Sequence, residues 1–300
     1  MKRIFGTRSS VAALTVSLAL AVPTAGGATS AAPETQATSE TQATSETQAV
    51  PGAQAAAEGA DPREAVLAER LEFALLGGEI LWIEAAGEKF LAILRAATGA
   101  ATQGGIVINA PIGAIVDGLP LHQTLARTAA AAGWFVLSIQ QPIPESRTIA
   151  LHDGELTARA GLRLDAGIDY LANQGIANVV IIGAAAGAAI AIRHFAGKVP
   201  PTVTGFVGLG AWDAPLDEVD IPVLGVAGTR DARAVSLQSL RMARLGARVT
   251  PVEVLEVDGA GPAFLGYEAL VAKRVRGWLK RMAPGATVKR TGAAVARPVP

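Results

Sequence analysis

The feature that most constrains the fold of this 300-residue chain is a series of short apolar runs, separated by longer stretches with helical periodicity. Such runs are typical of strands that are buried on both faces of a sheet. The expected strands are Gly105–Asn109, Trp134–Gln140, Asn178–Ile182, Val203–Leu209, Pro222–Ala227 and Val252–Val257. The expected helices are near residues 121–132, 154–173, 186–196 and 233–245, with a last one from about Phe264 to Met282. This alternation predicts an α/β fold, with a mainly parallel central sheet and helices on both faces.

An antiparallel hairpin is expected before this alternating region. Glu79–Glu84 and Glu88–Ala97 read as two strands on either side of Ala86-Gly87. A helix should precede them, with Asp61 as its N-cap, Pro62 in its first turn and Glu64 at the capping-box position.

The strand at Val179–Ile182 leads directly into Gly183-Ala184-Ala185-Ala186-Gly187 and then into a helix. A strand, a tight Gly-x-x-x-Gly turn and a helix form a nucleophile elbow, in which small residues permit a strained turn and close packing. The central position of this elbow is Ala185, whose methyl group cannot attack a carbonyl carbon.

Two further loops follow expected strands in the order in which hydrolases of this type place their catalytic acid and histidine. Pro222–Ala227 leads into Gly228-Thr229-Arg230-Asp231, and Val252–Val257 leads into Asp258-Gly259-Ala260-Gly261-Pro262. Nucleophile, acid and histidine occur in that chain order in α/β-hydrolases. The loop that ends at Asp231 resembles the loop that carries the catalytic acid in that fold, which makes Asp231 the acid-equivalent position. Asp231 also fits an N-cap for the next helix, which is the interpretation we favour.

Residues 61 to 282 resemble the α/β-hydrolase superfamily, and within it an uncharacterised group of exported bacterial α/β-hydrolase-like proteins. Besides the elbow, the resemblance rests on Gly133-Trp134, Leu137–Gln140, and the ending from Gly266-Tyr267-Glu268 to Arg276–Lys280. Members often read Gly-Ala-Gly-His where this chain has Gly259-Ala260-Gly261-Pro262. The resemblance implies that Ala185 and Pro262 replace the serine and the histidine of the triad.

The resemblance also implies an oxyanion site built from the backbone N–H groups of Ala186 and Ile112. In this chain the expected strand Ile106–Ile108 is followed by Asn109-Ala110-Pro111-Ile112. Many hydrolases have His-Gly after the equivalent strand. Proline has no backbone N–H, so one possible donor is lost at Pro111.

The N-terminus reads as an export signal. Lys2, Arg3 and Arg8 precede an apolar stretch from Val11 to Val22 and then small residues, which is the order of a signal peptide. We expect a signal peptide over residues 1–30 and a disordered linker over 31–60, which contains repeats of ETQATS. The hydrolase-like domain should span 61–282 and a flexible tail 283–300. A periplasmic or secreted location follows, with no membrane span after cleavage; an uncleaved anchor is the alternative.

Composition narrows the chemistry further. There are no cysteines, which excludes disulfides and thiol catalysis, and Lys+Arg and Asp+Glu both number 26, so no excess charge indicates nucleic acid as a partner. No cofactor is expected, because Ala185 stands at the second glycine of a dinucleotide-binding loop. The acidic residues Asp213, Asp217, Glu218 and Asp220 are a weak candidate for a metal site.

Two functions from different classes remain open, beside the weaker metal-dependent one. The first is a non-catalytic protein of the cell envelope that binds a small apolar ligand or another envelope protein. The second is an ester or acyl hydrolase with a displaced nucleophile. The serines of the expected domain are Ser138, Ser146, Ser236 and Ser239, and none has a Gly-x-Ser-x-Gly setting or a histidine nearby in the sequence. His122, His152 and His194 are scattered, and we expect each to be exposed or hydrogen-bonded rather than catalytic.

Overall fold

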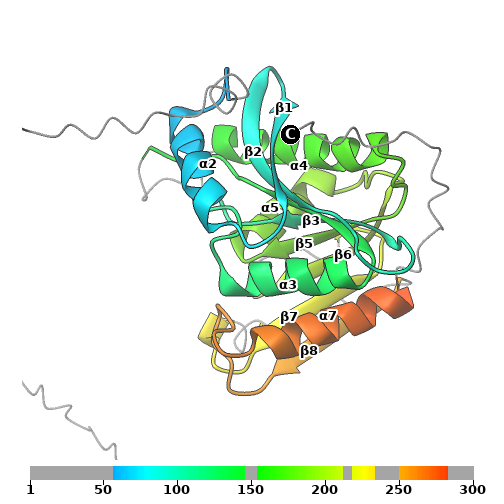
Figure 1. The fold of residues 1–300 in the computed structure, drawn as a ribbon. Helices are drawn as coiled ribbons and strands as arrows, with labels where there is room; N and C mark the ends of the chain where they lie inside the picture. Colours follow the sequence, from blue (N-terminus) through cyan, green and yellow to red (C-terminus); the bar gives the residue numbers. More distant parts are fainter. Residues whose placement is uncertain (1–56, 146–153, 212–217, 234–249, 283–300) are drawn as a thin grey trace, which may run out of the picture. The chain divides into compact units, whose positions relative to one another are not determined.

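A single mixed sheet organises the computed structural model, which describes residues 57–145, 154–211, 218–233 and 250–282 (Figure 1). The strand order across this sheet is β1-β2-β4-β3-β5-β6-β7-β8. The strands are β1 (Glu79–Ala85), β2 (Glu88–Arg95), β3 (Gly104–Asn109), β4 (Trp134–Ile139), β5 (Val179–Ala184), β6 (Val203–Leu209), β7 (Val223–Gly228) and β8 (Val252–Val257). These bounds lie within a few residues of those expected from the apolar runs.

The predicted α/β fold class is confirmed by the strand directions. β1 pairs with β2, and β2 with β4, in antiparallel register, whereas every other neighbouring pair from β4 to β8 is parallel. Ala86 and Gly87 connect β1 to β2 with φ angles of 52° and 85°. Positive φ at both central residues is the requirement of a type I′ hairpin turn, so this dipeptide sets the hairpin register.

Helices cover both faces of the sheet. They are α2 (Pro62–Ala74), α3 (Pro120–Ala131), α4 (Gly154–Asn173), α5 (Ala186–Phe195) and α7 (Glu268–Met282). α4 and α5 pack with Val107, Leu137 and Ile181 in one apolar cluster, while α3 and α7 pack with their strand neighbours Ile106 and Val136 in a second. Alternate residues of one strand enter opposite clusters, because successive side chains point to opposite faces.

The sequence predicted that the last helix begins near Phe264. In the structure it begins at Glu268. Phe264 has a φ of 54° and Gly266 a φ of 80°, so neither residue has helical backbone geometry. The ring of Phe264 is 1% exposed and packs in the cluster beneath α3 and α7. Burial of this ring supports a backbone conformation that L-residues rarely adopt.

The expected capping box at the start of α2 is only half right. Asp61 is the N-cap and accepts a hydrogen bond from the Arg63 N–H at 2.9 Å. Glu64 does not turn back to the cap: its carboxylate is fully buried and pairs with Arg163 of α4 at 2.7 Å. A buried carboxylate requires a partner, and the tertiary structure supplies a stronger one than the cap.

Several sequence-based expectations fall outside the described residues. They are the signal peptide, nearly all of the linker, the tail, the helix from residue 234 onward, Ser146, His152, Asp213, Asp217, Ser236 and Ser239. All described residues belong to one compact unit. Among them, no helix combines the length and the hydropathy that a membrane crossing needs.

Candidate active-site region at the carboxyl edge

Ala185 lies on a sharp turn between β5 and α5. Its φ and ψ angles are 44° and −122°, a combination that is rare for residues other than glycine. Its N–H donates to the Leu209 carbonyl at 2.9 Å, and its own carbonyl accepts from the Ala188 N–H at 3.1 Å. The residue is exposed, so its methyl group faces solvent at the carboxyl edge of the sheet. The backbone thus has the strained geometry of a nucleophile elbow without a nucleophilic side chain.

The two glycines of the elbow are required by close packing. A Cβ at Gly183 would lie 2.5 Å from the Cα of Ala188, and a Cβ at Gly187 would lie 2.6 Å from the carbonyl oxygen of Ala110. Neither site has room for a methyl group, because the nearest atoms belong to backbone. The Gly-x-x-x-Gly spacing therefore lets α5 sit directly against β5 and against the end of β3.

The predicted oxyanion segments are neighbours in the structure. Asn109, the last residue of β3, donates from Nδ2 to the Gly187 carbonyl at 2.8 Å and so holds the loop after β3 against the start of α5. In this loop the Ala114 N–H donates to the Pro111 carbonyl at 3.0 Å, which closes a turn around Ile112. The N–H of Ala186 has no hydrogen bond to any described residue, as expected for the first residue of a helix.

The side chain of Ile112 faces inward. It is 8% exposed and packs with Ala160 and Ile190. This contact anchors the turn on α4 and α5. That the backbone N–H of Ile112 is an oxyanion donor stays a prediction.

The acid-equivalent residue Asp231 is buried, with 7% of its surface exposed. Its Oδ1 accepts the backbone N–H of Arg233 at 3.1 Å, which is the hydrogen bond that an N-cap makes. The preceding residue, Arg230, donates its N–H to the Ala260 carbonyl at 2.9 Å. The loop after β7 is thus bonded to the loop that contains Pro262.

Pro262 lies on the same edge of the sheet as Ala185. β5 to β8 are neighbours and run parallel, so the loops that follow them emerge on one side. The Gly210 N–H donates to the Val226 carbonyl, and a Cβ at Gly210 would lie 3.3 Å from the carbonyl oxygen of Pro262. Pro262 itself is exposed. Its ring offers no proton donor or acceptor, so neither it nor Ala185 can do acid–base or nucleophilic work.

The described residues contain one serine, Ser138, and it is placed deep in β4. It is 1% exposed, and its Oγ has no hydrogen-bond partner. A serine nucleophile needs a base within hydrogen-bonding distance and access for the substrate, and Ser138 has neither. The other candidate serines, Ser146, Ser236 and Ser239, lie outside the described residues.

The two described histidines are in different environments. His194 of α5 is partly exposed, and its Nε2 lies 2.8 Å from Oδ2 of Asp165 on α4, in agreement with a satisfied surface histidine. His122 of α3 is 1% exposed and its Nδ1 has no partner, which contradicts the expectation that it would be exposed or hydrogen-bonded. Burial lowers the pKa of His122 to about 4, and the nearby carboxylate of Asp117 opposes this shift.

Sequence reasoning missed the polar pair beneath the elbow. Gln141 donates from Nε2 to Oδ1 of Asn109, and both side chains are fully buried. The available signal was that each follows or ends an apolar strand run, at the edge where open α/β sheets place their sites.

Among the described residues, no group of three or more His, Asp or Glu side chains could hold a metal ion.

Solved structures with the same fold are α/β hydrolases. A dienelactone hydrolase from Anabaena variabilis matches with a TM-score of 0.58 and 20% identity, over 69% of this chain and 98% of its own. Est1E from Butyrivibrio proteoclasticus matches with a TM-score of 0.55 and 13% identity, over 69% and 99%. XC6422 from Xanthomonas campestris, an α/β serine hydrolase without a lid, matches with a TM-score of 0.56 and 11% identity, over 70% and 97%.

These similarities, together with the strand order and the elbow, show that the protein has the α/β-hydrolase fold. The chain belongs to the family described as "Protein of unknown function (DUF3530)", whose model matches residues 11–161. No curated protein matches the sequence significantly.

Proposed function

We propose that this protein is a non-catalytic member of the α/β-hydrolase fold that acts in the cell envelope by binding a small apolar ligand or another envelope protein. The observation that carries the proposal is Ala185, an exposed alanine on a backbone turn that costs roughly 1–3 kcal/mol of strain. A turn with this cost is useful to an enzyme because it presents a nucleophile. Here it presents a methyl group.

The surroundings of the elbow agree with loss of catalysis. Pro262 stands at the histidine-equivalent position and cannot accept a proton. Asp231 uses its carboxylate to accept the backbone N–H of Arg233. The nucleophile and base positions thus both lack a reactive side chain. Losing both groups removes most of the rate enhancement of a serine hydrolase.

The test uses the purified full chain with an activated ester such as p-nitrophenyl butyrate and a fluorophosphonate probe that labels active serines. We expect no turnover above the buffer rate and no labelling of wild type. Ala185→Ser should also show no turnover, because the new serine would have no base. Ser138→Ala serves as the matched control and should behave as wild type.

Turnover that survives further purification, together with labelling of one serine, would overturn the proposal. A labelled peptide that contains Ser146, Ser236 or Ser239 would instead support the alternative, a hydrolase with a displaced nucleophile. The envelope location rests on the N-terminal residues alone. N-terminal sequencing of protein from the envelope fraction should find a new terminus after about residue 25 to 31, whereas an intact Met1 would contradict it.

A further inference from the structure

A cavity of about 450 Å³ lies on the opposite edge of the sheet from Ala185. Its wall includes Arg95, the last residue of β2, which pairs in register with Val136 near the start of the parallel strand β4. Ala185, in contrast, follows the carboxyl end of parallel strand β5. The volume is within the range of small-molecule sites, roughly 300–1,000 Å³. None of the triad-equivalent positions lines this cavity.

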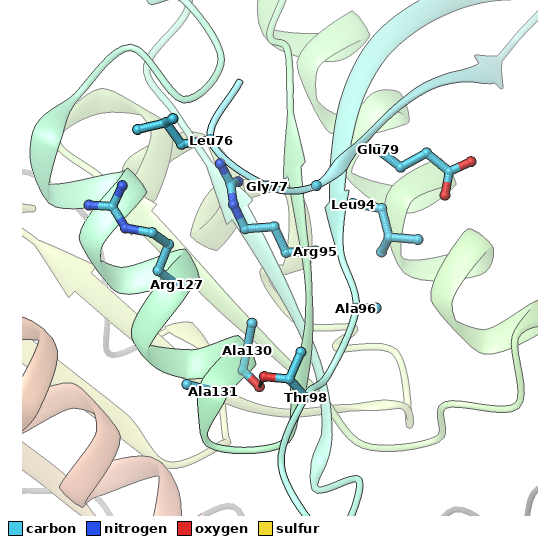
Figure 2. Close-up of a pocket in the computed structure, with 11 residues that line it drawn as sticks. Leu76, Gly77, Glu79, Leu94, Arg95, Ala96, Thr98, Arg127, Ala130 and Ala131 are labelled. Carbon is cyan, nitrogen blue, oxygen red and sulfur yellow. Dashed lines mark hydrogen bonds between the residues drawn. The ribbon is translucent and has the colours of Figure 1, made fainter. Parts of the chain in front are cut away.

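Three segments form the cavity: the turn between α2 and β1, the end of β2 with the residues that follow it, and the second half of α3 (Figure 2). Most of the wall is apolar and is contributed by Leu76, Leu94, Ala96, Ala130 and Ala131. Leu76 is 75% exposed. An exposed apolar rim on an apolar cavity marks a place where an apolar group can be buried.

Two guanidinium groups lie at one end of this wall. Figure 2 shows Arg95 and Arg127 on the same side as Leu76, whereas the carboxylate of Glu79 points away from both. Arg127 of α3 is exposed and has no ion-pair partner among the described residues. The cavity therefore combines an apolar wall with a cationic end, and this pairing distinguishes it from a plain hydrophobic gap.

Arg95 is a buried cation with unused donors. Its side chain is 6% exposed, and its Nη2 lies 2.5 Å from Oδ2 of Asp117. Its Nε and Nη1 are buried and have no hydrogen-bond partner. These two atoms are closed to solvent, as is Oδ1 of Asp117, so the pair acts on a ligand through its charge beneath the wall and not through direct hydrogen bonds.

The turn above Arg95 depends on two adjacent glycines. Gly77 and Gly78 have φ angles of 78° and 119°, and a Cβ on Gly78 would lie 3.2 Å from both Cγ of Arg95 and the Leu94 carbonyl oxygen. The backbone of this turn is thus packed tightly over the stem of Arg95. That packing leaves little room for the stem of Arg95 to move.

We propose that this cavity binds an amphipathic monocarboxylate, with its carboxylate at the exposed guanidinium group of Arg127, above the buried Arg95, and its alkyl chain along the wall of leucine and alanine side chains. The exposed guanidinium group of Arg127 can donate to both oxygens of the carboxylate. A single anion matches the site, because Asp117 already neutralises one of the two positive charges. This proposed binding site does not depend on whether the sheet edge that contains Ala185 is catalytic.

The test is isothermal titration calorimetry of the full chain with sodium decanoate, with 1-decanol as the uncharged arm and butyrate as the short-chain arm. We expect saturable binding of one decanoate per chain, and at least tenfold weaker binding of both comparison compounds. Arg127→Gln should weaken decanoate binding by about tenfold, the loss expected for one charged contact. Ala131→Phe should abolish it, since Ala131 is exposed and lines the cavity.

Two control variants make the outcome decisive. Arg193→Gln removes an exposed arginine of α5 outside the cavity and should bind decanoate as wild type does. Ala185→Phe blocks the elbow edge and should also leave binding unchanged. Absence of saturable binding to wild type, or equal affinity for decanoate and decanol, would overturn the proposal. So would loss of binding in Ala185→Phe but not in Ala131→Phe, which would place the ligand at the elbow edge instead.

Discussion

Glu64 and Arg163, which are 99 residues apart in the chain, form a buried ion pair between α2 and α4 with Oε1 and Nη1 2.7 Å apart. The second oxygen of Glu64 accepts the Leu91 N–H at 2.8 Å, and Nη1 of Arg163 also donates to the Gln140 carbonyl at 2.9 Å. Burial raises the pKa of Glu64, and the charge of Arg163 opposes that shift. The pair therefore joins α2, the hairpin strand β2, the end of β4 and α4 at one point.

Removing one partner of this pair should destabilise the fold strongly. Arg163→Met leaves the carboxylate of Glu64 buried without a counter-charge, and we expect the free energy of unfolding to fall by about 3–5 kcal/mol. Urea denaturation followed by circular dichroism measures the change. The double variant Glu64→Leu/Arg163→Met should recover much of the loss, because neither charge remains buried.

The exposed pair between Arg159 and Glu88 provides the matched control. Its atoms are 2.6 Å apart, but the side chains are 35% and 55% exposed. Arg159→Met should change the free energy of unfolding by less than about 1 kcal/mol. Equal effects of Arg159→Met and Arg163→Met would show that burial does not set the strength of these interactions.

The glycines of the elbow should not tolerate alanine. Gly187→Ala places a methyl group 2.6 Å from the Ala110 carbonyl oxygen, so either α5 or the end of β3 must move. We expect a loss of at least about 2 kcal/mol in the free energy of unfolding, as for other overpacked sites. Gly277→Ala in α7 has only one atom, at 3.7 Å, near the added methyl, and should stabilise the protein by about 0.5–1 kcal/mol through helix propensity.

Strain at the elbow predicts that Ala185→Gly stabilises the protein. Glycine adopts a φ of 44° without the steric cost that alanine incurs there, and this gain exceeds its greater loss of backbone entropy. We expect a rise of about 1 kcal/mol in the free energy of unfolding, measured by thermal or urea denaturation. Ala188→Gly, inside α5, is the opposing control and should destabilise by a similar amount. A destabilised Ala185→Gly would mean that the turn is not strained.

The buried His122 predicts a loss of stability in mild acid. Its pKa is about 4 in the folded protein and 6.5 is the ordinary value, so the unfolded chain binds more protons between these two pH values. The free energy of unfolding should therefore fall as the pH falls from about 6.5 to 4, by up to roughly 3 kcal/mol from this residue. Well above pH 6.5 the imidazole is neutral in both states and contributes no slope.

Denaturation series at several pH values test this contribution. His122→Leu should lose this part of the slope between pH 6.5 and 4, because no imidazole remains to be protonated. His194→Gln, which changes a partly exposed histidine paired with Asp165, should keep it. A slope that is the same in wild type and His122→Leu would assign the acid sensitivity to other groups.

Much of the fold was predictable from local pattern. Apolar runs such as Val179–Ile182 predict buried strands because strands covered on both faces need apolar residues at every position. The elbow glycines and the hairpin around Ala86-Gly87 were also recognisable, whereas the type I′ geometry of that hairpin turn is a finding of the structure. The order of the three loops along the chain then predicted one edge of a parallel sheet, and strands β5 to β8 have that arrangement.

The sequence by itself determined which groups are chemically absent: a chain with alanine at 185 and proline at 262 has no nucleophile or base there in any fold. Only the tertiary structure decided which distant side chains meet. Glu64 fits a helix cap by spacing, yet it is buried against Arg163, because the energy of an unpaired buried charge exceeds that of a capping hydrogen bond. Arg95, Arg127 and Leu76 come together only through the packing of α2, β2 and α3, which no local pattern encodes.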